Sequence, residues 1–161
     1  MSKGLIAVMF IACISAIGIE GCSHKKPKAD EAIVSALDNT GYGTSDEGKA
    51  LGLKTVFFDY DSHLLSHEAK YILKHNFEIL NNNPNLKIQV EGNCDERGGI
   101  QYNLALGDKR ANSVKLYLQD LGITENRITT ISFGKEHPLV SGDTEEAYAK
   151  NRRANFAITS K

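Results

Sequence analysis

From about Leu53 onward, segments with the two-residue hydrophobic period of strands alternate with segments of helical period, and this alternation limits the possible folds most strongly. Strand patterns occupy Thr55–Tyr60, Leu86–Gly92, Thr129–Gly134 and Ala154–Thr159, and helical patterns occupy Ser66–Asn82, Tyr102–Leu121 and the short stretch Glu145–Asn151. This order predicts an α+β fold, in which helices pack on one face of a sheet to form two layers.

Two of the predicted helices have clear ends and a clear apolar face. Ser66 is a good N-cap for the first, and the segment NNNP ends it. In the second helix, apolar and small residues recur at steps of three and four, as in a helix that packs on a sheet. They are Leu104, Gly107, Ala111, Val114, Leu118 and Leu121.

The N-terminal segment has a different composition. Lys3 is followed by an apolar run of about sixteen residues, GLIAVMFIACISAIGI, which is short for a membrane-spanning helix and suits an export signal. The run leads into IEGC, which resembles a lipobox and predicts a signal peptide over 1–21 with lipid on Cys22. An uncleaved anchor or an ordinary secretory signal remains an alternative.

Lipidation of Cys22 would leave Cys94 as the one thiol of the mature chain, because Cys13 lies in the signal. No disulfide framework is then expected. The polar, glycine-dotted stretch 22–53 is predicted to be a flexible tether, and 54–161 to be the folded domain. A formal net charge of −1 gives no basic field for nucleic acid, so no nucleic-acid partner is expected.

Polar residues gather where the second predicted strand ends. The loop Gly92–Gly99 holds Asn93, Asp95 and Arg97, and Arg110 lies two helical turns after Asn103 on one side of the next helix. An acidic loop beside an arginine fork suits a ligand that carries an ammonium and a carboxylate on one carbon. The other interpretation is an internal ion pair between Asp95 and Arg110.

Three segments together resemble the OmpA-like peptidoglycan-binding domain family, nearest to its lipoproteins of the Tol–Pal system. They are VEGNCDERGGIQYNLALGDKRANSVKLYLQDLGI, SFGKEHPLV and AYAKNRRANFAI. The resemblance covers roughly Thr55 to Ile158 and implies a β-α-β-α-β-α-β sandwich with a mixed four-stranded sheet. It also implies a non-enzymatic outer-membrane lipoprotein, with its domain in the periplasm, that links the membrane to the wall in envelope integrity and cell division. Ser23 after the lipid cysteine favours the outer membrane under the sorting rule of enteric bacteria.

The family motifs place the expected ligand contacts residue by residue. The aspartate of G-[HN]-x-D falls on Asp95, and the arginine of N-x-x-L-x-x-x-R-A falls on Arg110. In the family this pair holds meso-diaminopimelate of the peptidoglycan stem peptide. Cys94 stands where a small residue is usual, which leaves its effect on binding open. The binding residues expected from the resemblance are Asp61, Asn93, Asp95, Arg97, Asn103, Leu106 and Arg110.

The sequence also contains features of three other functions. FDYDS resembles the DxDx loop of haloacid-dehalogenase-like phosphatases, but His63 replaces the usual Thr or Val, and the chain is too short for that fold's remaining motifs. His63 and His67 have a metal-ligand spacing without a visible ligand set, so neither metal nor cofactor is expected. In the family, a periplasmic Tol propeller protein and a Tol membrane protein bind near the positions of Glu96 and Arg97. The resemblance therefore leaves open a protein-interaction module with little wall binding.

Overall fold

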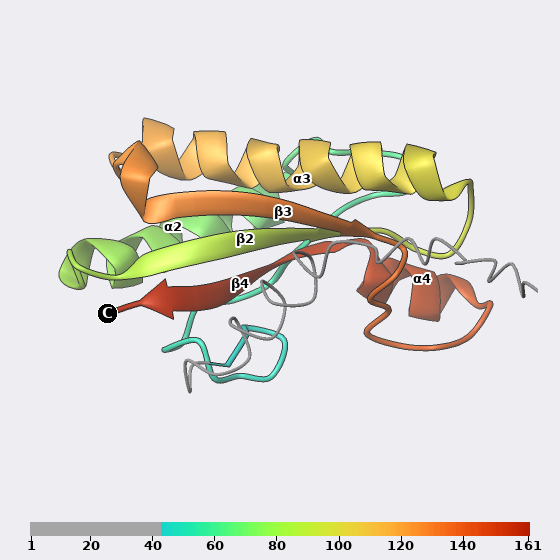
Figure 1. Cartoon of the computed structure of the whole chain (residues 1–161), viewed down its shortest axis with the longest axis horizontal. Helices are drawn as coiled ribbons and strands as arrows, with labels where there is room; N and C mark the ends of the chain where they lie inside the picture. Colours follow the sequence, from blue (N-terminus) through green and yellow to red (C-terminus); the bar gives the residue numbers. More distant parts are fainter. Residues whose placement is uncertain (1–42) are drawn as a thin grey trace, which may run out of the picture.

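The computed structural model describes residues 43–161 (Figure 1). The predicted signal, Cys22 and most of the predicted tether lie outside these residues. Within 43–161, no helix has both the length and the apolar character needed to cross a membrane.

The described chain forms the predicted α+β fold around one mixed sheet of four strands in the order β1-β4-β2-β3. β4 pairs antiparallel with both β1 and β2, whereas β2 and β3 run parallel. The strands are β1 (Val56–Phe57), β2 (Lys87–Asn93), β3 (Ile128–Gly134) and β4 (Arg153–Ser160), and the helices are α2 (His67–Asn82), α3 (Ile100–Asp120), the 3₁₀ turn η1 (Glu125–Arg127) and α4 (Glu145–Asn151). Helix α4 and the β2–α3 loop lie at the same end of the sheet (Figure 1).

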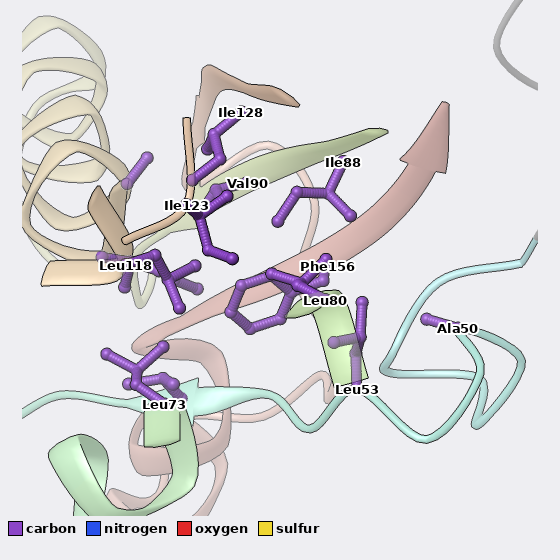
Figure 2. Packing of buried hydrophobic residues seen from close by; sticks show 14 of the residues in the cluster. Ala50, Leu53, Leu73, Leu80, Ile88, Val90, Leu118, Ile123, Ile128 and Phe156 are labelled. Carbon is purple, nitrogen blue, oxygen red and sulfur yellow. The ribbon is translucent and has the colours of Figure 1, made fainter. Parts of the chain in front are cut away.

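The core lies between one face of the sheet and the helices α2 and α3. Alternate strand residues such as Ile88, Val90 and Phe156 point into it, because successive side chains of a strand face opposite sides. They meet Leu73 and Leu80 of α2, with Phe156 in the middle of the cluster (Figure 2). Burial of these apolar side chains is the main stabilising contribution, at roughly 25 cal/mol per Å² removed from water.

The ends of α2 are held by specific hydrogen bonds. The Ser66 side chain accepts from the backbone N–H of Ala69 at 3.1 Å, as the N-cap prediction requires. At the other end, the Arg127 guanidinium donates to the carbonyls of Leu80, Asn83 and Leu86 at 2.8–2.9 Å. Two of these carbonyls belong to the last turn and the cap of α2, where the helix itself offers no donors.

The first strand is much shorter than the predicted Thr55–Tyr60. Only Val56 and Phe57 pair with β4, opposite Ala154 and Arg153. Beyond them the backbone turns, because the carbonyls of Asp59 and Ser62 accept from the side chain of Arg110 instead of from a neighbouring strand.

The prediction that the tether extends to residue 53 is wrong at its C-terminal end, because residues 43–53 pack against the domain. Thr44 forms a bridge with Ala157 of β4, and Ala50 and Leu53 are buried in the core. The glycines that suggested flexibility serve turns here: Gly48 and Gly52 have φ of 69° and 88°, a region that disfavours other residues. The folded part therefore extends at least to residue 43.

Candidate functional site

A cavity of about 140 Å³ opens where β2 runs into α3. Its walls come from the loop after β1, the loop after β2 and the first turns of α3. Ten residues line it: Tyr60, Asp61, Cys94, Asp95, Arg97, Gly98, Tyr102, Asn103, Leu106 and Arg110. The structure thus brings together six of the seven predicted binding residues, all except Asn93.

Arg110 reaches the cavity from α3 and links the walls of the cavity by hydrogen bonds. Its side chain is 0% exposed, and its Nε, Nη1 and Nη2 donate to the carbonyls of Ser62, Asn93 and Asp59 at 2.8–3.1 Å. Burial lowers the pKa of this guanidinium, but arginine starts so far above neutrality that it stays cationic. The three carbonyls do not use all five N–H donors of the guanidinium, which also lies beside the Cys94 thiol in the cavity wall.

Asp95 is also buried and is bound by two arginines. Arg97 Nη2 lies 2.6 Å from Oδ2, and Arg152 Nη1 lies 3.4 Å from the same oxygen. Burial acts to raise the pKa of Asp95, but the hydrogen bonds and charge of Arg97, aided by Arg152, outweigh it and hold that pKa below its ordinary value. Asp95 therefore presents a carboxylate to the cavity at neutral pH.

The predicted alternative, an internal ion pair between Asp95 and Arg110, is not the arrangement found. Asp95 pairs with Arg97 and Arg152, and Arg110 binds backbone carbonyls. Both charged groups nevertheless face the same cavity. This arrangement suits a small ligand with an ammonium and a carboxylate, each of which would meet its opposite charge.

The remaining predicted residues complete the walls. Asp61 has φ of 51° and accepts from the hydroxyl of Tyr102, and this hydrogen bond raises the pKa of the tyrosine. Asn103 is buried and donates from Nδ2 to the carbonyl of Arg97 at 2.8 Å, which ties α3 to the loop. Leu106 adds an apolar surface.

The prediction that Asn93 contacts the ligand is wrong for its side chain. On β2, Asn93 faces the same side of the sheet as Glu91, away from the core residue Val90. Its Nδ2 donates to the carbonyl of Glu91 at 3.1 Å and to Oδ1 of Asn155 at 2.8 Å. Only its backbone carbonyl reaches the site, where it accepts from Arg110.

Cys94 lines the cavity as a buried, protonated thiol. Its Sγ donates to the carbonyl of Asn103 at 3.3 Å, and burial raises its pKa. A thiol with a raised pKa is a poor nucleophile, so Cys94 acts here as a small packing residue.

Three site residues were missed by sequence reasoning or left without a role. Tyr60 and Tyr102 line the cavity, although neither was among the predicted binding residues. Arg152 pairs with Asp95 and Glu145, while Arg153 pairs with Asp46. The signal for Arg152 was its place in the NRR segment of the family pattern.

Of the acidic and histidine residues of the phosphatase and metal alternatives, only Asp61 lines the cavity. Asp59, His63 and His67 do not line it, and Asp59 contributes only its carbonyl to Arg110. Across residues 43–161, no group of three or more His, Cys, Asp or Glu side chains is placed to hold a metal ion.

Comparison with known proteins agrees with this geometry. Residues 57–152 match the OmpA family. The chain is similar to the peptidoglycan-associated lipoprotein of Pasteurella multocida, at 38% identity over 98% of this chain and 97% of that protein, and to that of Haemophilus influenzae, at 43% over 73% and 75%. The crystal structure of the peptidoglycan-associated lipoprotein from Burkholderia pseudomallei aligns with a TM-score of 0.63 at 38% identity, covering 65% of this chain and 89% of that one. The chain therefore belongs to the OmpA family, in its group of peptidoglycan-associated lipoproteins.

Proposed function

We propose that this chain is an outer-membrane lipoprotein that binds the meso-diaminopimelate stem peptide of peptidoglycan without a covalent bond. Lipid on Cys22 would hold it to the membrane, and residues 23–42 would span part of the distance to the wall. Its domain would lie in the periplasm and link the two layers as part of the Tol–Pal system, in envelope integrity and cell division.

The observation that carries this proposal is the cavity that both Asp95 and Arg110 line. The free end of meso-diaminopimelate is a zwitterion, and its ammonium would meet Asp95 while its carboxylate would meet the guanidinium of Arg110. Asp61, Asn103 and Leu106 surround this position, and Arg97 lies at its mouth. The names of the relatives, peptidoglycan-associated lipoproteins, support the same ligand class.

The proposal is a binding role without catalysis. The thiol of Cys94 is protonated, and Asp95 is held by two arginines and lacks an adjacent base, so neither is arranged as a nucleophile. A Tol propeller protein and a Tol membrane protein would be additional partners at the loop around Glu96 and Arg97. Glu96 is exposed there and accepts from the hydroxyl of Tyr148.

The Asp95→Asn variant is expected to lose wall binding while keeping its fold. Asparagine keeps the size and still accepts hydrogen bonds, and Arg152 retains Glu145 and the carbonyl of Phe58 as partners. Loss of the charge opposite the ligand ammonium should weaken binding about thirtyfold or more. Sedimentation with purified sacculi measures this, with circular dichroism as the check on folding.

Asp108→Asn is the matched control for this experiment. Asp108 is an exposed acid on α3 that does not line the cavity, so removing its charge should leave sedimentation unchanged. If Asp95→Asn sediments as wild type does, the proposed function is wrong.

A soluble stem peptide with meso-diaminopimelate is expected to bind at least about tenfold more tightly than the same peptide with L-lysine. The lysine peptide lacks the second carboxylate, so the charge of the buried Arg110 guanidinium would stay without an anionic partner in the cavity. Isothermal titration of both peptides at equal salt measures the ratio. Equal affinities would rule out Arg110 as the carboxylate contact.

A further inference from the structure

The carboxylate of Asp95 has no unused acceptor site. Its Oδ1 accepts from the backbone N–H and the Nε of Arg97 at 3.1 and 3.2 Å, and its Oδ2 accepts from Arg97 Nη2 at 2.6 Å and from Arg152 Nη1 at 3.4 Å. A carboxylate offers about four lone-pair positions, and each of these is occupied. A ligand ammonium can therefore bind Asp95 only if one of these donors leaves.

The two arginines differ in how firmly they are held. The Arg152 side chain is 8% exposed, and besides Asp95 it binds Oε1 of Glu145 at 2.8 Å and the carbonyl of Phe58 at 3.1 Å. The Arg97 side chain is 34% exposed. Arg97 is thus the donor that can move without leaving a buried charge unpaired.

Arg97 also has a second place to go. Its Nη1 lies 3.3 Å from Oε2 of Glu145, a residue of α4 whose side chain is 61% exposed. Its guanidinium carbon lies 4.2 Å and 4.3 Å from the ring centres of Tyr60 and Tyr148, within cation–π distance of both. Glu145 and Tyr148, both on α4, can keep the guanidinium bound after it has left Asp95.

We propose that the Arg97 guanidinium is an internal competitor of the ligand, which occupies the ammonium position at Asp95 and moves towards Glu145 when a ligand enters. This role rests on the proposed function, since it takes an amino-acid ammonium as the entering group. Only the molecules in which Arg97 has moved away can bind the ammonium. The apparent affinity is then the intrinsic affinity multiplied by the small fraction of such molecules. A ligand with only a carboxylate has no cation to replace Arg97 at Asp95, so Arg97 also contributes to specificity for a zwitterion.

The test compares Arg97→Met with wild type in isothermal titration of the soluble meso-diaminopimelate stem peptide. The variant loses the competing cation, but Asp95 keeps the backbone N–H of residue 97 and the contact with Arg152. Its binding is expected to be about threefold to tenfold tighter. Arg97→Lys keeps a cation near Asp95 without the arginine fork, so its gain in affinity should be smaller than that of Arg97→Met.

Lys109→Met controls for the loss of a positive charge alone, because Lys109 is exposed on α3 and outside the cavity. If the wild-type protein does not bind the peptide, the proposed function itself is wrong. If the wild type binds and Arg97→Met binds no more tightly, only the competitor role is overturned. Weaker binding by Arg97→Met would make Arg97 a ligand contact.

A measurement on the wild-type protein is independent of the folding of any variant. In NMR titration with the same peptide, the Arg97 Nε–H, now bound to Asp95, should change its chemical shift strongly at saturation. The Arg152 Nε–H, bound to the carbonyl of Phe58, should change little. An unchanged Arg97 signal at saturating peptide would contradict the proposal.

Discussion

The Arg110→Ala variant is expected to lose about 3–5 kcal/mol of unfolding free energy, besides its wall binding. The guanidinium is 0% exposed and donates to three carbonyls, two in the loop after β1 and one at the end of β2. Alanine would leave these acceptors without a donor and open a void beneath the ring of Phe58, which lies 5.2 Å from the guanidinium carbon. Urea denaturation followed by circular dichroism measures the loss as a lower midpoint.

Arg127→Ala provides the matched comparison. Arg127 also donates to three carbonyls, but it is only half-buried. It belongs to η1 and contacts the end of α2, outside the cavity. Its removal should cost about 1–2 kcal/mol, because water can replace part of its hydrogen bonding. At temperatures where it stays folded, this variant should still sediment with sacculi. If Arg110→Ala unfolds at the same urea concentration as the wild type, Arg110 does not hold the walls of the cavity together.

The fold could be predicted largely from sequence because its signals are local. The hydrophobic period, the Ser66 cap and the NNNP stop predict α2 as it is found, at His67–Asn82 directly after its N-cap. The shortening of β1 had no local signal. It depends on the carbonyls of Asp59 and Ser62 turning towards Arg110, which lies 48 or more residues further along the chain.

The site could be predicted only in part, for a related reason. Spacing and family motifs indicated Asp95 and Arg110, and both line the cavity. Neither spacing nor motif shows which face of β2 carries a side chain after the irregularity between Gly92 and Asn93, so Asn93 was assigned to the wrong side. The partners of Asp95 are Arg97 and Arg152. Arg152 lies far along the chain, directly before β4, and it comes near Asp95 only because β4 pairs with β2 in the sheet.

The contact between α3 and β2 depends on two glycines that face each other. A Cβ built on Gly92 would lie 1.9 Å from the carbonyl oxygen of Gly107, and one on Gly107 would lie 2.3 Å from the hydroxyl of Ser132. Glycine inside a helix costs about 1 kcal/mol relative to alanine, so Gly107 gives up helix stability for this close approach. The approach matters for function, because Asp95 follows β2 while Asn103 and Arg110 lie on α3.

Gly92→Ala is therefore expected to destabilise the domain by about 3 kcal/mol or more, since the new methyl group meets backbone atoms of α3, which cannot rotate away as a side chain can. If α3 shifts outward instead, Arg110 moves from the end of β2 and peptide binding falls even in the folded fraction. Gly99→Ala is the control: its φ is −76°, and nothing lies within 4 Å of its new Cβ, so its peptide affinity should stay close to wild type. Because Gly99 is the N-cap of α3, its urea midpoint should fall slightly, by much less than that of Gly92→Ala. Should Gly92→Ala match Gly99→Ala in both measurements, the close packing of α3 on β2 would not be what positions the charged pair.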